Sequence, residues 1–426
     1  MAIMTQKKDD HFKGLVVTWL LGLTFLFPWN SILTIGDYYY ALFPDYHPSR
    51  VFTLLYQLLS LIATLIFTWY EANVSTRLRV LFGYGPYAIL LLLFIIVSTA
   101  LLPRHSHKLI DVSTSGHGGI GPYVGVCVLV AGIGIADGVA QGAIVGDLSF
   151  MDPTYIQAYS AGLAMSGLVT SGMRFITKAA FRDSQSGLRK GALTFFAIAT
   201  FVEVAGFVLY AFVFPKLNTI KGYRISAKNQ GARTVKDDLD AAGLEADRDG
   251  EPGKPPTRLT VRQLGVRIWD YLIGQIILYM VSLSIFPGFL YEDTGTHDLG
   301  SWYALVLVAI YNGGDFAGRY VPLWRGLSDR VVPSRVALLT LSAARVAFVP
   351  FFYVTAKRGD AGWMMALCAL LGLTGGWLSV LGFMRAPRGF SGPEQNAIGN
   401  LMILALIFGL TLGVLSGWLW LIGKGW

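Results

Sequence analysis

Residues 302–320 read WYALVLVAIYNGGDFAGRY, an apolar stretch that contains one acid, Asp315, and one base, Arg319. The stretch approaches the roughly 20 apolar residues with which a helix crosses a bilayer. Charged side chains at membrane depth are costly, so they usually face the interior of a helix bundle or a wet cavity. The four-residue spacing puts both charges on one helix face, which Asn312 shares. The sequence therefore predicts a polar site inside a membrane-spanning bundle.

Two interpretations of Asp315 and Arg319 remain open. The pair can brace neighbouring helices as a buried structural ion pair, or it can line a permeation pathway. Removing one partner of a buried pair leaves an unpaired charge, which costs roughly 3–5 kcal/mol in soluble proteins. Loss of activity in a single variant therefore does not separate the two interpretations.

The composition indicates a polytopic membrane protein. Of 426 residues, 54% are hydrophobic and only 14% are charged, against about 25% charged in a typical soluble domain. The formal net charge is +8, but the basic residues lie mostly in predicted loops, where they orient the chain and meet an anionic leaflet. No basic patch is interleaved with aromatics, so we expect no nucleic-acid partner. The expected partner is the lipid bilayer, and no obligate protein partner is evident.

The hydrophobic pattern predicts an all-α bundle of eleven transmembrane helices. The expected spans lie near 14–36, 50–70, 80–102, 121–148, 155–178, 191–214, 264–290, 301–323, 333–355, 361–384 and 396–421.

A polar segment, 215–262, divides the chain into a six-helix half, 1–214, and a five-helix half, 263–426. Its mixed charges and its Gly/Pro-rich run offer too little apolar surface to fold alone, so we expect a disordered cytoplasmic loop. Lys and Arg in the loops favour a cytoplasmic N-terminus, and an odd number of spans then puts the C-terminus outside.

The first span contains FPWN at residues 27–30. Pro28 is expected to kink the helix, Trp29 offers a flat face to a planar ring, and Asn30 offers donors and acceptors. A Trp near a helix end also fits an interfacial aromatic belt, and that alternative stays open. A second proline break, at 286–287 in the seventh span, is consistent with a binding region, because broken helices in two halves of a transporter often mark one.

The fourth span repeats glycine at every fourth residue. These glycines are Gly134, Gly138, Gly142 and Gly146. A stripe of small residues lets another helix approach closely, so it is a packing feature.

Asp137 and Gln141 lie beside that stripe, also four residues apart. Both can hydrogen-bond a polar solute, although Gln141 can instead bond a neighbouring helix and Asp137 can pair with Arg345 of the ninth span. Glu203 falls within the sixth span, and the sequence assigns it no role.

No catalytic residue is expected. The chain lacks a G-x-S-x-G elbow, an H-E-x-x-H zinc motif and a Walker phosphate loop, and its histidines all lie in predicted loops or the terminus. Cys127 and Cys368 fall in apolar runs without disulfide or metal spacing, so no metal or other cofactor is expected. Solute transport remains the leading function, with a membrane receptor or enzyme as the alternative.

These features together resemble the equilibrative nucleoside transporter family over essentially the whole chain. The resemblance rests on FPWN at 27–30, QG at 141–142, GLA at 162–164, N-x-x-D-x-x-G-R at 312–319 and G-x-x-x-G at 409–413. In the third of these motifs, Gly162 is a further candidate for helix packing. The stretches at 37–50 and 187–192 are most similar to the plant branch.

The resemblance implies a nucleoside carrier of major-facilitator-like fold that works by alternating access. It implies that Trp29 and Leu33 line the cavity, that Gln141 bonds the nucleobase, and that Asp315 and Arg319 contact the ribose. Purine and pyrimidine nucleosides such as adenosine and uridine are the expected solutes. A carrier of a nucleobase or a sugar is the alternative.

The resemblance also leaves the coupling mode open. Many animal members have a small residue where this chain has Asp137. An additional acid in the membrane is a candidate proton carrier, and proton symport is implied for some plant members. Transport is therefore expected to be either facilitative or proton-coupled. The plasma membrane is the expected location, with the vacuolar membrane as the alternative.

Overall fold

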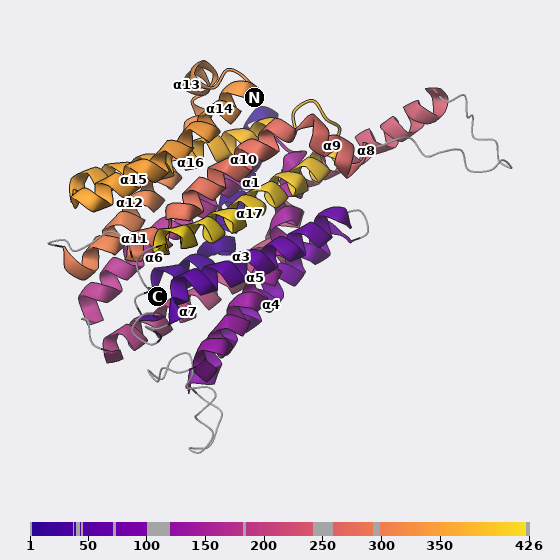
Figure 1. The fold of residues 1–426 in the computed structure, drawn as a ribbon. Coiled ribbons are helices and arrows are strands. Elements are labelled where there is room, and N and C mark those ends of the chain that lie inside the picture. The colour runs from indigo at the N-terminus through magenta and orange to yellow at the C-terminus, as the bar shows by residue number, and fades with distance from the viewer. Residues whose placement is uncertain are drawn as a thin grey trace.

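The computed structural model describes residues 2–36, 38–39, 43, 46–70, 74–99, 120–181, 185–241, 259–292 and 299–422, and these ranges contain helices and no strand. The long helices run side by side as one bundle (Figure 1).

The first half comprises α1 (Ala2–Thr34), α3 (Pro48–Trp69), α4 (Thr76–Thr99), α5 (Ile120–Ser149), α6 (Pro153–Phe181), α7 (Gln185–Val208), η2 (Leu209–Val213) and η3 (Phe214–Lys216). It is followed by α8 (Asn218–Ala241).

The second half comprises α9 (Val261–Arg267), α10 (Trp269–Ile285), α11 (Gly288–Glu292), η4 (Gly300–Trp302), α12 (Tyr303–Gly318), η5 (Val321–Leu323), α13 (Arg325–Val331), α14 (Arg335–Ala344), η6 (Arg345–Ala347), α15 (Phe348–Arg358), α16 (Ala361–Arg385), α17 (Gly392–Gly417) and η7 (Trp418–Leu421). As expected, the seventh span breaks at 286–287, between α10 and α11.

Eight helical segments in the described ranges are long and apolar enough to cross a membrane. Helices also cover the three other expected spans, as α4, α6 and α12. With so many apolar helices, the chain is a multi-pass membrane protein.

The two halves repeat the same helix packing. In the first half α1 packs on α6 and α3 on α5; in the second half α10 packs on α17 and α12 on α16. Glycines make the closest approaches: a Cβ at Gly162 would collide with the backbone of α1 at Trp19, and one at Gly409 with that of α10 at Ile276. The predicted packing role of Gly162 is therefore seen as a close contact between α6 and α1.

The glycine stripe of α5 serves two helices rather than one. A Cβ at Gly134 or Gly138 would collide with backbone carbonyls of α3, whereas Gly142 and Gly146 lie against the side chain of Asn400 in α17. Four residues turn an α-helix by about 400°, so a four-residue stripe drifts by about 40° at each step. Over the length of the stripe this drift moves the contact from one neighbouring helix to the next.

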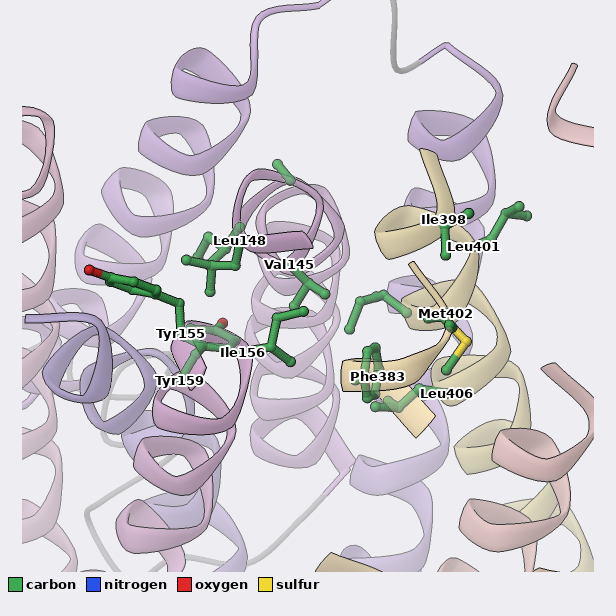
Figure 2. Close-up of a cluster of buried hydrophobic side chains, with 14 of the residues drawn as sticks. Val145, Leu148, Tyr155, Ile156, Tyr159, Phe383, Ile398, Leu401, Met402 and Leu406 are labelled. Carbon is green, nitrogen blue, oxygen red and sulfur yellow. The ribbon is translucent and has the colours of Figure 1, made fainter. Parts of the chain in front are cut away.

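The two halves share one hydrophobic cluster at one end of the bundle, and at the other end they are joined by a hydrogen bond from Arg50 of α3 to the Gly417 carbonyl of α17 at 2.6 Å. At the end where α17 begins, one hydrophobic cluster joins both halves: Val145 and Ile156 of α5 and α6 face Phe383 and Met402 of α16 and α17 (Figure 2). At the opposite end each half keeps a separate cluster, one around Trp29 and Phe52, the other around Ile285, Phe289 and Leu307.

The segment after the sixth span differs from the disordered loop that we expected. Residues 218–241 form α8, which extends away from the bundle (Figure 1). Its first turns are anchored, because Ile220 is fully buried and Arg224 pairs with the buried Asp147 of α5. The prediction counted only the apolar surface of the segment itself and missed the anchor that the bundle supplies. Residues 242–258 of the expected loop lie outside the described residues.

Candidate functional site

A cavity lies between the two halves, near the middle of the long helices. Every residue predicted to bind solute lines it, together with the candidate proton carrier. These residues are Trp29, Asn30, Leu33, Asp137, Gln141, Asn312, Asp315 and Arg319. Three helices, α1, α5 and α12, bring them together from distant parts of the sequence.

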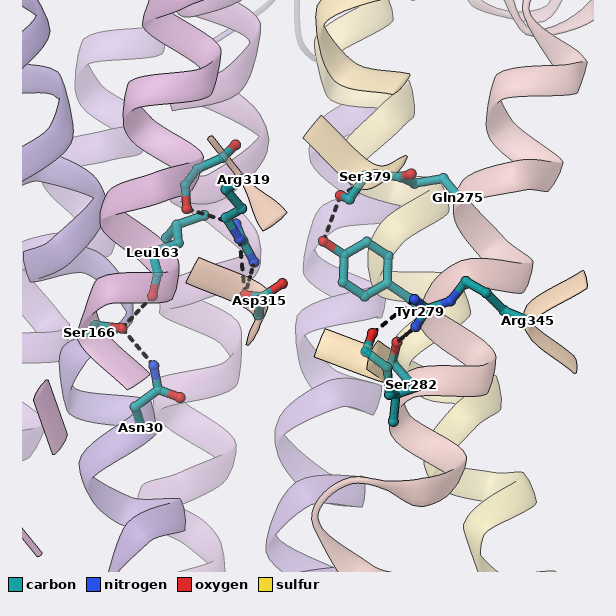
Figure 3. Close-up of polar contacts among 12 residues, drawn as sticks. Asn30, Leu163, Ser166, Gln275, Tyr279, Ser282, Asp315, Arg319, Arg345 and Ser379 are labelled. Carbon is teal, nitrogen blue, oxygen red and sulfur yellow. Dashed lines mark hydrogen bonds and ion pairs between the residues drawn. The ribbon is translucent and has the colours of Figure 1, made fainter. Parts of the chain in front are cut away.

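The two oxygens of the Asp315 carboxylate have different environments (Figure 3). Arg319 donates from Nε and Nη2 to Oδ2, at 3.0 and 2.9 Å. Among the described residues, no group donates to Oδ1. The side chain keeps 15% of its surface exposed, and the residue lines the cavity. One carboxylate oxygen is thus held in place while the other stays available to a solute.

Arg319 also joins the two halves. Its Nη1 donates to the Ser160 carbonyl of α6 at 2.8 Å, and the Gln157 amide of α6 donates to its backbone carbonyl at 3.1 Å. The ion pair with Asp315, by contrast, lies wholly within the end of α12. The bracing contact between helices is therefore made by the arginine, and the aspartate orients that arginine.

Glycines set the position of this pair. A Cβ at Gly314 or Gly318 would collide with backbone carbonyls of α16, and a Cβ at Gly372 or Gly376 would collide with those of α12. Reciprocal close packing of this kind fixes the rotation of α12 about its axis. Asp315 and Arg319 consequently face the cavity.

Two asparagines connect the cavity wall to α6. Asn30 donates to Ser166 Oγ at 2.6 Å, and Asn312 donates to the Gly167 carbonyl at 3.1 Å and to Ser171 Oγ at 2.9 Å. Their NH2 groups are thus engaged within the protein. Both residues line the cavity, so their carbonyl oxygens are the groups left to a solute.

Gln141 has a free amide. In the described part of the chain it forms no hydrogen bond with another residue, although only 6% of its surface is exposed. The alternative that Gln141 bonds a neighbouring helix is therefore wrong for this structure. A buried amide without a protein partner is costly unless a solute or water satisfies it.

Asp137 does not pair with Arg345. Asp137 accepts a hydrogen bond from Ser60 Oγ of α3 at 3.2 Å. Arg345 lies in η6 of the second half and donates to the Leu371 carbonyl at 2.9 Å and to Ser282 Oγ at 2.7 Å. The suggested pairing fails because Asp137 lines the cavity from the first half, whereas Arg345 lies in the second half and outside the lining. The sequence does not display this arrangement.

Trp29 is an inward residue rather than part of an interfacial belt. It is 4% exposed, lines the cavity, and stacks on Tyr56 of α3 with ring centroids 3.7 Å apart and planes 6° from parallel. One face of the indole is thus covered by Tyr56. The stacked pair forms a flat aromatic wall, which suits a planar ring.

Sequence reasoning missed several residues of the second half. Tyr279 lines the cavity and shares a 2.8 Å hydrogen bond with Ser379 of α16, and Tyr311 stacks on Phe286 at 4.5 Å. A signal existed for Tyr279, because Gln275, Tyr279 and Ser282 form a polar stripe with helical spacing. Tyr311 lies in an apolar run without such a signal.

The described residues offer no cluster of three or more His, Cys, Asp or Glu side chains that could hold a metal. The cavity instead combines aromatic walls with a few polar groups, as is usual for sites that bind small organic molecules. The two cysteines are free thiols, with Cys127 half-buried and Cys368 buried.

Comparisons with known proteins agree on one family. The family profile described as "Nucleoside transporter" matches residues 127–422. The chain is 46% identical to "Equilibrative nucleotide transporter 3" of Arabidopsis thaliana, over 98% of this chain and 97% of the relative. It is 47% identical to "Equilibrative nucleotide transporter 4" of the same plant, over 98% and 96%.

Solved structures show the same fold at low sequence identity. A proton:xylose symporter of the major facilitator superfamily superposes with a TM-score of 0.62 at 13% identity, covering 97% of this chain and 89% of that one. A bacterial homologue of the iron transporter ferroportin gives 0.55 at 12% identity, covering 95% and 92%. The fold is thus all-helical and major-facilitator-like.

Proposed function

The chain belongs to the equilibrative nucleoside transporter family, as its plant relatives show, and on that premise we propose how its cavity recognises and moves a nucleoside. The protein is a multi-pass transporter of nucleosides, and its family and fold are those of transporters rather than enzymes. Its proposed solutes are purine and pyrimidine nucleosides such as adenosine and uridine.

We propose that Asp315 binds the ribose. The observation that carries this proposal is the unpaired Oδ1 of a carboxylate whose other oxygen is held twice by Arg319. Vicinal hydroxyls donate to a carboxylate oxygen, and hydrogen bonds to a charged acceptor are stronger than neutral ones. Arg319 holds the carboxylate in one orientation through Nε and Nη2, so its role toward the sugar is mainly positional.

The nucleobase is proposed to lie toward Gln141, Trp29 and Leu33. The free amide of Gln141 has a donor and an acceptor for a base edge. The Trp29–Tyr56 stack supplies a flat wall against which a base ring can pack. The carbonyl oxygens of Asn30 and Asn312 lie on the same lining, where they can accept from the solute.

Movement of the solute is proposed to follow alternating access of the two halves. We propose eleven spans with the N-terminus in the cytoplasm and the C-terminus outside, so that the shared hydrophobic cluster closes the cytoplasmic end. Release into the cytoplasm then requires that cluster to separate. Protease access to an N-terminal tag in intact cells tests this orientation, because cleavage from outside would contradict it. The plasma membrane is the proposed location.

Proton coupling is proposed to act through Asp137, which lines the cavity but lies outside the proposed ribose and base contacts. An inward proton gradient should then drive nucleoside accumulation, and Asp137→Asn should remove the effect of pH. If pH changes nothing in the wild-type protein, transport is facilitative.

The decisive experiment is uptake of labelled uridine and adenosine by proteoliposomes at two external pH values. We expect saturable uptake that unlabelled nucleosides inhibit. Inhibition by a sugar or a free base, with no inhibition by adenosine, would assign the cavity to one of those solutes instead. Uptake no greater than in protein-free liposomes would reject transport altogether.

A further inference from the structure

A second acid, Glu203, lies in the interior of the first half, away from the cavity. It projects from the last two turns of α7, at the middle of the apolar span Lys190–Lys216. It has no exposed surface and is not part of the cavity lining. Within the described residues neither of its two carboxyl oxygens has a hydrogen-bond partner. An ionised carboxylate in such a place lacks both water and protein donors, and this state is very costly. The geometry therefore favours the neutral acid.

The groups around Glu203 are neutral or acidic. They are Tyr84 and Tyr87 of α4, Asp137 of α5 and Tyr159 of α6. Thr24 of α1 lies beside Gly206, one turn further along α7. Arg174 of α6 also meets α7, but at Gly191, roughly 18 Å from Glu203 along the helix axis at 1.5 Å per residue. No cation among the described residues is thus placed to neutralise Glu203.

Asp137 connects this interior to the cavity. It lines the cavity, and its carboxylate has two hydroxyl neighbours on α3, Tyr56 and Ser60, of which Ser60 donates to Oδ2 at 3.2 Å. Its Oδ1 is buried and has no hydrogen-bond partner in the described chain. The hydroxyl of Tyr159 also lacks a hydrogen-bond partner among the described residues, and that of Tyr87 has only the backbone of Trp29 beside it. Both tyrosines lie within electrostatic range of the two acids. Two acids that share one dry region do not readily ionise together, because each disfavours the charge of the other.

We propose that Glu203 is an internal proton-binding site of this transporter, reached from the cavity through Asp137. In the described state Glu203 holds the proton. When the cavity opens to one side, Glu203 gives this proton to the Asp137 carboxylate, which releases it into the cavity and leaves Glu203 ionised. When the cavity opens to the other side, a proton from the cavity binds Asp137 and passes on to the ionised Glu203, which leaves Asp137 ionised and bonded to Ser60. The step moves one proton and no electrons, and it rests on the proposed nucleoside transport.

The test uses the purified full-length protein with Glu203→Gln and Glu203→Asp. Glutamine keeps the shape of the neutral acid but cannot take up or release a proton. Aspartate keeps the carboxyl group on a side chain that is one methylene shorter. Asp329→Asn is the matched control, since Asp329 is an exposed acid that pairs with Arg385 outside the cavity. Two readouts are needed: the infrared C=O band of protonated carboxyls, and proton entry during uridine uptake, followed with a pH-sensitive dye inside the liposomes.

We expect Glu203→Gln to lose one component of the protonated-carboxyl band and all uridine-driven proton entry, while exchange of labelled uridine at equal pH continues. Glu203→Asp should retain proton entry at a lower rate, and the control should match the wild type. Wild-type proton entry in Glu203→Gln, an unchanged infrared band, or no proton entry in the wild type would overturn the inference. Absence of any uridine uptake by the wild type would instead reject the proposed function.

Discussion

Asp315 shows at the scale of one residue why a buried charge in a membrane is informative. Its Oδ2 is held by Arg319, its Oδ1 has no hydrogen-bond partner among the described residues, and the residue lines the cavity. A purely structural pair would be expected to satisfy all of its buried acceptors, because each unmet one is costly. The different environments of the two oxygens therefore favour a role for Asp315 in binding the solute and a role for Arg319 in holding α12 against α6.

Asp315→Asn should raise the Kd for uridine by about 10- to 100-fold, because a hydrogen bond to a charged group contributes about 1.5–3 kcal/mol. Equilibrium binding of labelled uridine to purified protein measures this change. Asp270→Asn is the control, because Asp270 is also an acid paired with an arginine but does not line the cavity. Its Oδ1 lies 4.0 Å from Nη1 of Arg335.

The charge swap Asp315→Arg with Arg319→Asp tests whether an ion pair within α12 is all that these two residues supply, because the swap also removes the Arg319 hydrogen bond to Ser160. The swap keeps an ion pair within α12 but directs a guanidinium at the solute, so uptake should stay lost. Recovery of uptake in the swapped protein would show that the pair is only a brace.

Gln141→Leu should weaken nucleoside binding by about tenfold, since a base edge loses its partner at a cost of about 1–3 kcal/mol. Its melting temperature should not fall, because Gln141 bonds no other described residue. Gln275→Leu is the contrast: Gln275 donates to Ser379 at 2.9 Å, so its loss should lower the melting temperature. Melting temperatures and uridine affinities of the two variants test both expectations. A large loss of stability in Gln141→Leu would contradict the assignment of Gln141 to solute binding.

At the scale of elements, glycine contacts decide where the polar side chains point. The close approaches of α12 to α16 and of α6 to α1 leave no room for a Cβ. Such contacts fix both the separation and the rotation of each helix pair, and so aim Asp315 and Asn30 at the cavity. Packing residues outside the site thus control its geometry.

Gly162→Ala should destabilise the protein, because its Cβ would collide with the backbone of α1 at Trp19. Overpacking of this kind typically costs about 1–3 kcal/mol. Gly172→Ala is a matched control on the same helix, since nothing lies within 4 Å of a Cβ there. Melting curves of the two variants in detergent should show a loss for Gly162→Ala only, and equal melting temperatures would refute the packing role.

At the scale of the whole molecule, the two halves meet differently at the two ends of the cavity. One cluster crosses between the halves where α17 begins, whereas each half has its own cluster at the other end. Helix α8 makes further contacts at the end where α17 begins. It pairs with α5 through Arg224 and Asp147, and it packs against the start of α17 at Gly392.

A disulfide between α8 and α17 should therefore arrest transport. A Cβ at Gly392 would lie 3.0 Å from the Cβ of Ala227, near the roughly 3.5–4.5 Å that a disulfide needs. In the double variant Ala227→Cys with Gly392→Cys, oxidation should stop uridine uptake and a reductant should restore it. The single-cysteine variants should transport under both conditions, and undiminished uptake by the oxidised, cross-linked protein would show that this end need not open.

Much of the site was predictable because a charge or amide at membrane depth is rare and costly. Asp315, Arg319 and Gln141 stood out for that reason, and all three line the cavity. The pairing of Asp137 with Arg345 was wrong, since contact between distant helices depends on packing that one sequence does not display. The anchoring of α8 was missed for the same reason.

The sequence by itself determined that this chain is a helical membrane protein, which family it belongs to, and which residues are too polar for lipid. Those features follow from local composition and from motifs of a few residues. Only the tertiary structure decided which oxygen of Asp315 has no hydrogen-bond partner among the described residues and which hydroxyl donates to Asp137. It also decided that Glu203 is enclosed with no hydrogen-bond partner in the described chain. Each of these depends on the rotation and spacing of helices far apart in the chain, which many glycine and side-chain contacts set together.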